Sequence, residues 1–290
     1  MAQEADAVQA EPEEARKPAR RILEQEIAEG LGEIERPTLG LFMAGLSAGL
    51  DISFSLLLMA VTLTAFAGQR PSPLVDLLVA NMYSVGYIFV IIGRSELFTE
   101  HTTLAVLPVL NRRASVSELF KLWFVVYLAN LLGTTIFALL LSVIGPALGV
   151  IEATVFDTLA AHMVDHQWWV ILLSATLTGW LMGLLSWLVT AGRDTISQIV
   201  LIWLITTAIG FVGLHHAITG SVEVLTAIFA NQSITFSEYG HFLLWTTIGN
   251  AVGGVVFVAL IKYSHVFYAS SHHDDISLDD GGASPKSKSV

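Results

Sequence analysis

Two long apolar stretches of this chain are interrupted by glycine and by polar or charged residues. The first interruption runs from Gly93 to His101 with the sequence GRSELFTEH, and the second runs from Gly213 to Gly220 with the sequence GLHHAITG. A bilayer core has no water to satisfy unpaired backbone groups, so irregular backbone at membrane depth must be buried in protein or line a polar path. The two breaks therefore predict a membrane protein with a path through it.

The breaks belong to an internal repeat with an offset of 120 residues. That offset joins Gly93 with Gly213, Asn130 with Asn250, and Gly133 with Gly253. Breaks at matching places in two halves are typical of transporters whose substrate path lies between the repeats. Because small residues let membrane helices approach closely, we expect the four residues of the last two pairs to serve helix packing.

The composition is that of a membrane protein. Of its 290 residues, 54% are apolar and 13% are charged, whereas a soluble domain carries about 25% charged residues. Six apolar blocks follow one another at residues 39–67, 74–109, 119–145, 168–190, 195–231 and 241–267. A spanning helix needs about 20 residues, so the second and fifth blocks, which contain the breaks, are too long for one straight span. We predict an all-α protein with six transmembrane helices, the second and fifth being interrupted.

The distribution of positive charge indicates the orientation. Six spans place both termini on one side, which carries Arg16, Lys17, Arg20, Arg21, Arg36, Arg112, Arg113, Lys121, Arg193 and Lys262, whereas the other side offers Arg70. Cytoplasmic loops carry an excess of lysine and arginine, so we expect both termini in the cytoplasm. The second repeat (about 168–267) starts after three spans and runs in the opposite sense to the first (about 39–145). The sequence therefore predicts an inverted repeat.

The two ends of the chain differ from its apolar middle. Residues 1–19 and 269–290 have the polar composition of disordered cytoplasmic tails, although His272-His273-Asp274-Asp275 contains side chains that can bind a metal. Apolar residues at helical spacing in 20–36 predict an amphipathic interfacial helix, which leaves 37–268 as the transmembrane domain. The acidic N-terminus lacks the apolar core of a cleavable signal peptide.

Several classes of chemistry find no support in the sequence. The chain has no cysteine, which excludes disulfides and thiolate catalysis. Gly45-Leu46-Ser47-Ala48-Gly49 matches the serine-hydrolase elbow, but that elbow needs a strand–turn–helix context, and here it lies in an apolar helical block. There is no Walker loop, dinucleotide fingerprint or His-Glu-x-x-His motif. We predict no enzyme activity, no cofactor, no metal site and no nucleic-acid partner.

Four motifs, in order along the chain, resemble those of formate/nitrite transporters. They are Ala48-Gly49 with Ser53 in the first helix, Ser95-Glu96-Leu97-Phe98-Thr99 in the second, Tyr127-x-x-Asn130-Leu131-x-Gly133 in the third and Ile248-Gly249-Asn250-x-x-Gly253-Gly254 in the sixth. His216, at the break of the fifth helix, falls where that family has its central pore histidine. The resemblance covers about residues 20–268.

The resemblance implies a fold, an assembly and a substrate class. It implies an aquaporin-like inverted repeat of six helices in the inner membrane, and a homopentamer with one pore per protomer. It also implies passage of small monovalent anions such as formate, nitrite, hydrosulfide or lactate, often coupled to protons. In that family the residues matching Leu97 and Phe98 narrow the pore, and the threonine matching Thr99 contacts the moving loop.

The chain departs from the family pattern at positions that handle substrate. The family's lysine near the outer start of the fourth helix falls at Met163, beside His162, Asp165 and His166, and two family asparagines fall at Gly179 and Gly220. Asp51 stands at a position that is commonly apolar, and Arg94 is a charge that the family normally lacks there. These departures concern the substrate more than the fold.

His216 is the first candidate for pore chemistry. A neutral imidazole can donate a hydrogen bond or a proton to an anion, and with an unperturbed pKa of about 6.5 either protonation state is accessible. The alternative is a packing histidine bonded to a backbone carbonyl at the break. His215 is a second candidate and points elsewhere.

The charged residues near the first break form the second candidate group. Arg94 either attracts anions in place of the missing lysine or joins Glu96, Glu100 and Asp51 in an internal ion-pair network that fixes the loop. In the second case Glu96 would also cap backbone N–H groups. An unpaired Asp51 in the pore would repel anions.

The interpretation that joins these features is a channel or proton-coupled transporter for a small monovalent anion or weak acid. The helix-break dipoles, Arg94 and His216 would draw the anion in, and Leu97 and Phe98 would constrict its path. Two alternatives stay open. One is the same fold passing a neutral or cationic solute, and the other is a non-transporting membrane scaffold or sensor that signals through its acidic tails.

Overall fold

The computed structural model describes residues 17–69 and 71–271. Arg16, Arg70, most of both predicted tails and the histidine–aspartate segment at 272–275 lie outside the described residues.

Six helical runs in the described part of the chain are long and apolar enough to cross a membrane, which confirms the predicted fold class. They are Thr38–Ala65 (α2, Thr38–Ile52, and α3, Phe54–Ala65), α4 (Pro73–Ile92), α7 (Val116–Ala147), α9 (Trp168–Ala191), α10 (Thr195–Val212) and Phe236–Tyr268 (within α12, Phe236–Val252, η2, Gly253–Leu260, and α13, Ile261–Ser271). The shorter helices are α1 (Ala19–Glu35), η1 (Ala67–Gln69), α5 (Phe98–Leu104), α6 (Val106–Leu110), α8 (Thr154–Val164) and α11 (Ala217–Phe229). The chain is a multi-pass membrane protein.

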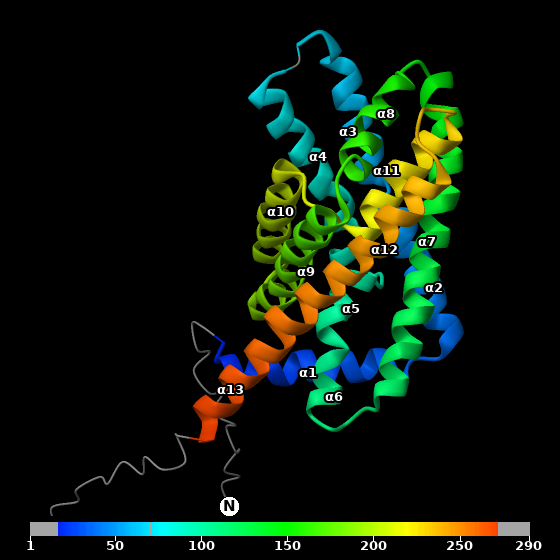
Figure 1. The fold of residues 1–290 in the computed structure, drawn as a ribbon. Coiled ribbons are helices and arrows are strands. Elements are labelled where there is room, and N and C mark those ends of the chain that lie inside the picture. Colours follow the sequence, from blue (N-terminus) through cyan, green and yellow to red (C-terminus); the bar gives the residue numbers. More distant parts are fainter. Residues whose placement is uncertain (1–16, 70, 272–290) are drawn as a thin grey trace, which may run out of the picture.

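The second and fifth spans stop where the sequence predicts. Helix α4 ends before Gly93, and the next residue, Arg94, adopts the left-handed conformation with φ of 60°. Helix α10 ends at Gly213, with φ of 74°. A left-handed residue stops a right-handed helix. The chain then resumes as α5 and α11, which lie in the lower and upper halves of the bundle in Figure 1.

Close contacts between helices are built on glycine in both halves. Helix α2 packs along α7, and α9 packs along α12. A Cβ atom on Gly49 would overlap the backbone of Asn130, and a Cβ atom on Gly179 would overlap the backbone of Asn250. The predicted packing glycines lie at the same two crossings, Gly133 against α2 and Gly253 against α9. The hydrolase-like glycines of α2 therefore lie at a helix crossing.

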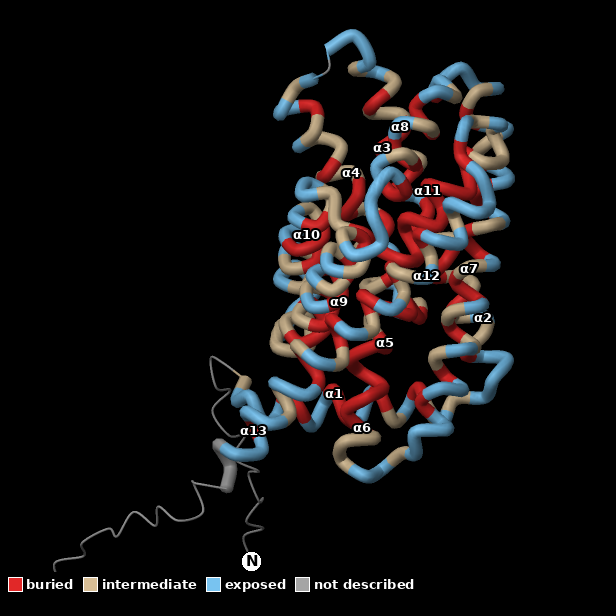
Figure 2. Tube along the Cα trace, viewed as in Figure 1, coloured by how far each residue is buried: buried red, intermediate tan, exposed pale blue. Residues whose placement is uncertain are grey.

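The core follows the inside of the bundle. Figure 2 shows buried residues running through its centre, with α5 and α11 mostly buried. Large apolar side chains such as Phe124, Val143 and Leu204 are exposed on the outer faces. In a multi-pass membrane protein these faces meet lipid or neighbouring subunits.

Two further irregularities were not predicted. The first span is divided at Ser53, whose hydroxyl donates to the carbonyl of Gly49 at 2.7 Å. The sixth span contains the π-helical stretch η2, in which the carbonyl of Gly254 accepts a hydrogen bond from Thr103 of α5 at 3.1 Å. Side chains that bond helix carbonyls bend or widen helices, so both irregularities follow from contacts that sequence spacing does not show.

Helix α1 lies across the end of the bundle near the described termini (Figure 1) and packs against α6, α9 and α13. Its buried side includes Ile22, Leu23 and Ile27, and its exposed side includes Glu24. This is the segment expected to be an amphipathic helix, and its place at a membrane interface stays a prediction. At the other end of the chain α13 continues to Ser271, so 269–271 are helical.

Candidate pore site

The first break is held by Asn130 of α7. Its side-chain oxygen accepts from the N–H of Phe98 at 2.8 Å. Its amide nitrogen donates to the carbonyls of Gly45 at 2.7 Å and Glu96 at 2.8 Å. Asn130 is fully buried, and irregular backbone at that depth needs such partners. One side chain therefore fixes the loop to both α2 and α7.

Asn250 of α12 does the same at the second break. Its oxygen accepts from the N–H of Ala217 at 2.9 Å, and its nitrogen donates to the carbonyls of Ala175 at 2.8 Å and His215 at 3.1 Å. The helices that follow the breaks begin after Leu97 and His216, which are 119 residues apart. The second loop is thus one residue shorter, and His216 is the counterpart of Leu97.

His216 is the N-terminal cap of α11. Its Nδ1 accepts hydrogen bonds from the N–H groups of Ile218 and Thr219, both at 3.2 Å. An accepting Nδ1 places the imidazole proton on Nε2, because a neutral imidazole has one donor nitrogen. That Nε2–H donates to the hydroxyl of Thr99 on α5 at 2.8 Å. The histidine thus joins the two half-helices across the centre of the protein.

Hydroxyl groups continue the chain of hydrogen bonds away from His216. The Thr219 hydroxyl lies 3.3 Å from His216 Nδ1 and 2.8 Å from the Tyr87 hydroxyl. The Tyr87 hydroxyl lies 2.7 Å from that of Tyr83. The Tyr87 ring also meets the His216 ring edge to face, with the centroids 5.4 Å apart. Four polar groups from α4 and α11 therefore form one connected row.

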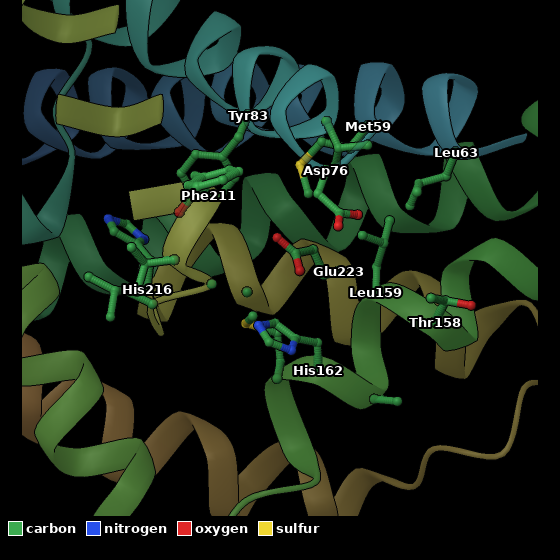
Figure 3. A pocket seen from close by; sticks show the side chains of 18 of the residues that line it. Met59, Leu63, Asp76, Tyr83, Thr158, Leu159, His162, Phe211, His216 and Glu223 are labelled. Atoms are coloured by element: carbon green, nitrogen blue, oxygen red, sulfur yellow. The ribbon is translucent and has the colours of Figure 1, made fainter. Parts of the chain in front are cut away.

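A cavity of about 670 Å³ leads to this row from the end of the bundle opposite α1, and we call it the vestibule. Figure 3 shows its lining, which includes Tyr83, His162, His216 and Glu223. Helices α3 and α4 form one wall, and α8, the end of α10 and α11 form the others. His216 both lines the vestibule and makes the hydrogen bond to Thr99 of α5.

The residues that start α5 are buried. Leu97 and Thr99 are fully buried, and Phe98 is 4% exposed. Phe98 packs against Trp123 and Tyr127 of α7, with centroids 6.0 and 4.8 Å apart. The predicted role of Leu97 and Phe98 as an apolar constriction, which would control passage by excluding water, stays a prediction. Thr99 contacts His216 through its hydroxyl group, whereas Phe98 is turned toward α7.

Asp51 and Arg94, which the sequence allowed to pair with each other, have different partners in the structure. Asp51 accepts hydrogen bonds from Ser47 at 3.0 Å and from Ser95 at 3.1 Å. Arg94 has an 80% exposed side chain, and its guanidinium lies 3.6 Å from Glu29 of α1. Arg94 therefore faces α1 at the end away from the vestibule, and Asp51 fixes the first loop.

Glu96 belongs to an ion-pair network that ties α1 to the first break. Its carboxylate accepts from Arg36 at 2.7 Å and lies 2.6 Å from His101 Nε2. Arg36 also donates to Glu33 at 2.8 Å. Glu96 was also expected to cap backbone N–H groups, but its carboxylate bonds Arg36 and His101, and the first N–H of α5, that of Phe98, donates to Asn130.

A second link between α1 and the bundle is made by Glu26. Its side chain is fully buried and accepts hydrogen bonds from Ser186 at 3.1 Å and Thr190 at 2.7 Å, both on α9. Burial raises the pKa of Glu26 to about 7, and the two hydroxyl donors offset part of that rise. Glu26 can therefore hold its proton at mildly acidic pH.

His215 points away from the vestibule, as expected for the residue next to His216. Its Nδ1 lies 2.8 Å from the hydroxyl of Ser174 on α9. Its ring centroid lies 5.4 Å from that of His166 and 6.3 Å from that of Phe242. Its side chain packs between α9 and α12 and is not part of the described lining of the vestibule.

The family asparagine positions occupied here by glycine have packing roles. Gly179 touches the backbone of Asn250 so closely that no side chain fits there. A Cβ atom on Gly220 would lie 2.5 Å from the Phe242 ring and 3.3 Å from the Met163 sulfur. Met163, at the place of the family lysine, is buried. The vestibule therefore takes its polar groups from other residues.

Sequence reasoning missed Tyr83, Tyr87, Thr219 and Glu223. All four are at most 4% exposed, and all lie on α4 or α11. The signal for Glu223 was available, because an acid inside an apolar block is expensive and usually functional. The tyrosines are ordinary in a membrane sequence, and their row of hydroxyls becomes visible only when α4 is placed beside α11.

An inverted pair of broken membrane helices, joined by a capping histidine at the end of a polar vestibule, defines a class of channels and transporters. The model of the formate/nitrite transporter family matches residues 20–264, and the chain belongs to that family. This confirms the resemblance seen in the sequence motifs.

Individual relatives agree with this assignment. The chain is 32% identical over 262 residues to the inner membrane protein YfdC of Escherichia coli (strain K12), covering 88% of this chain and 82% of that protein. An FNT family ion channel has a TM-score of 0.75 and 25% identity, covering 86% of this chain and 99% of its own. A pentameric formate channel with formate bound has a TM-score of 0.70 and 23% identity, covering 80% and 98%.

Proposed function

We propose that the chain is a pore that moves a small monovalent anion of a weak acid, of the formate or nitrite kind, together with a proton. The observation that supports this most is the Nε2–H of His216, a residue that lines the vestibule and donates to Thr99. An anion that displaces the Thr99 oxygen would receive that hydrogen bond.

The capping role favours a neutral His216. If Nδ1 gained a proton, it could no longer accept from the N–H groups of Ile218 and Thr219, and the first turn of α11 would lose its cap. His216 therefore acts as a hydrogen-bond donor rather than as a cation. The anion must gain its proton from elsewhere before it crosses the apolar layer formed by Leu97 and its neighbours.

The N-terminal N–H groups of α11 do not bind an anion directly, although the helix dipole favours negative charge there. The N–H of Ala217 is bonded by Asn250, and the next two N–H groups of α11 are bonded by His216. None of these three donors is free for an anion, so direct contacts must come from side chains. Arg94, which faces α1, would act on anions at the other mouth of the pore.

The proposal includes an assembly, a membrane and an orientation. The exposed apolar faces and the likeness to a pentameric formate channel support a homopentamer with one pore per protomer. The likeness to an inner membrane protein supports a place in the inner membrane. The positive charges of Lys17, Arg20 and Arg36 near α1 support cytoplasmic termini, which puts the vestibule on the opposite side.

A specific observation favours a second candidate, the passage of a neutral or cationic solute. Asp76, Asp165 and Glu223 line the vestibule, and no described lining residue is lysine or arginine. Negatively charged side chains in the vestibule repel anions. This candidate keeps the fold and replaces the anion with an uncharged or positive molecule.

The test is uptake into proteoliposomes. The purified protein is reconstituted, and the entry of formate, nitrite, acetate and hydrosulfide is followed with and without an imposed proton gradient. Entry of at least one anion, faster than in protein-free vesicles, is expected. Entry of none, together with osmotic swelling in uncharged solutes, would replace the anion proposal with the second candidate.

A further inference from the structure

Glu223 of α11 is an acid buried in the wall of the vestibule. It is 3% exposed, and Figure 3 shows its carboxyl group between Asp76 and Tyr83 on one side and His162 on the other. His216, Gly220 and Glu223 all line the vestibule. Their spacing of four and three residues puts them on one face of the helix, and at 1.5 Å per residue Glu223 is about 10 Å along α11 from His216.

Glu223 differs from the other buried acids by having no partner in the described part of the chain. Glu26 accepts from two hydroxyl groups, and Glu96 is paired with Arg36 and His101. For Glu223 no hydrogen bond or ion pair accompanies its burial. An ionised carboxylate at membrane depth is costly without such partners, so the group is suited to hold a proton.

The groups that face Glu223 across the vestibule come from several elements. Asp76 and Tyr83 lie on α4, and His162, Asp165 and His166 lie on α8 and the residues after it. The acids disfavour a negative charge on Glu223, whereas the histidines, when protonated, favour it. The group therefore stands where an incoming anion meets an acidic lining before it reaches His216.

We propose that Glu223 is the proton donor of the vestibule, which converts a small carboxylate or other weak-acid anion to its neutral acid before it reaches His216. This inference rests on the proposed function and adds the source of the proton. It also explains how an acidic mouth is compatible with an anion, because a protonated Glu223 donates a hydrogen bond to the anion instead of repelling it.

The step is balanced by solvent on the side where the vestibule opens. The O–H bond of Glu223 breaks, and an O–H bond forms on the anion. The neutral acid moves on to His216, and the carboxylate of Glu223 takes a new proton from vestibule water. One proton is drawn from that side for each anion that enters, and Glu223 ends as it began.

The test measures anion and proton entry in proteoliposomes for the wild type and for Glu223→Gln and Glu223→Asp. Glutamine has the shape of the protonated acid but cannot release a proton. Glu152→Gln is the matched control, because Glu152 is an exposed acid at the same end of the bundle, outside the vestibule. Assembly of each variant is checked by gel filtration.

The expected result is a change of pH profile as well as rate. Without the donor, entry depends on acid already neutral in solution, whose fraction falls about tenfold per pH unit above the pKa of that acid. Formate entry through Glu223→Gln should fall with that slope and be at least about tenfold below the wild type near neutral pH. The wild type, Glu223→Asp and Glu152→Gln should keep a shallower profile and co-entry of protons.

A chemical test on the wild type does not depend on the folding of variants. Dicyclohexylcarbodiimide, an apolar reagent for protonated carboxyl groups, should modify Glu223, as read by peptide mass spectrometry, and should stop formate entry. Absence of that modification overturns the inference. So does a Glu223→Gln protein with wild-type rate and proton co-entry, which leaves the proposed function standing. A wild type that moves no anion overturns both.

Discussion

Asn130 and Asn250, 120 residues apart, make the same three hydrogen bonds at the two breaks. Each accepts from the first N–H of the following half-helix and donates to one loop carbonyl and one carbonyl of the neighbouring span. The internal repeat therefore extends to the hydrogen bonds of single side chains. Each asparagine satisfies backbone that the bilayer could not.

Replacing either asparagine should weaken the protein more than replacing an ordinary polar residue. Asn130→Ala removes the partner of the Phe98 N–H and of the Glu96 carbonyl in the loop, and each buried unsatisfied group costs about 1–3 kcal/mol. We expect a loss of at least about 2 kcal/mol, measured as a lower thermal midpoint of the assembly in detergent. Asn81→Ala, which removes a bond to Trp203 near the surface, should change the midpoint little.

The glycine at the second crossing should not accept even a methyl group. A Cβ atom on Gly179 would overlap the carbonyl of Asn250, and backbone of two packed helices cannot move aside cheaply. We expect Gly179→Ala to lower the yield of assembled protein or its thermal midpoint. Gly32 of α1 is exposed, with no atom within 4 Å of its Cβ position, so Gly32→Ala should raise stability by up to about 1 kcal/mol. Equal effects of the two changes would contradict this reading.

The sequence predicted the spans and breaks because both depend on local composition. Gly213 ends α10 in the left-handed conformation that glycine adopts readily, whereas at the first break the left-handed residue is Arg94. A 120-residue offset is visible without coordinates. The fold class, the interrupted spans and the family all follow from such patterns. The one-residue difference between the loops makes His216 the counterpart of Leu97. It could be recognised only from the positions where α5 and α11 begin in the structure.

The site was predicted less completely, because its contacts join residues far apart in the chain. Arg94 and Asp51 carry opposite charges and could pair, yet Arg94 lies near Glu29 and Asp51 accepts from two serines. Which partner a charge finds depends on how α1 crosses the bundle. The row of hydroxyls that ends at Tyr83 likewise depends on the approach of α4 to α11, which no spacing rule gives.

Glu26 should make the stability of the protein depend on pH. Burial raises its pKa in the folded protein to about 7 from 4.5, so the folded state keeps a proton that the unfolded state loses. Stability contributed by this group is full below pH 4.5 and falls as the pH rises to about 7, by about 3 kcal/mol in all. Above that pH no further loss is expected from Glu26.

The measurement is the thermal midpoint at a series of pH values. Glu26→Gln keeps the shape of the protonated side chain and has no proton to lose, so its midpoint should fall less between about pH 5 and 7 than that of the wild type. Glu24 lies on the same helix with an exposed side chain, and Glu24→Gln should keep the wild-type slope. A wild-type slope in Glu26→Gln would assign the pH dependence to other groups.

His216 combines capping and hydrogen-bond donation, and two substitutions separate these roles. In His216→Ala the N–H groups of Ile218 and Thr219 lose their acceptor, and the Thr99 hydroxyl loses its donor. Loss of a helix cap costs about 0.5–2 kcal/mol, so this variant should be both less stable and inactive in anion entry. Asparagine is a good cap with a shorter reach, so His216→Asn should recover much of the stability.

The two variants should therefore differ in thermal midpoint and agree in transport. Anion entry in His216→Asn should stay at least about tenfold below the wild type, which corresponds to the loss of one hydrogen bond to a charged group. The control is Thr226→Ser on the same helix, which keeps the hydroxyl bond to Val222 and lies outside the vestibule. If His216→Asn moved formate at the wild-type rate, capping alone would explain the histidine, and the donor at the pore would have to be sought in the hydroxyl groups of Thr99 and Tyr87.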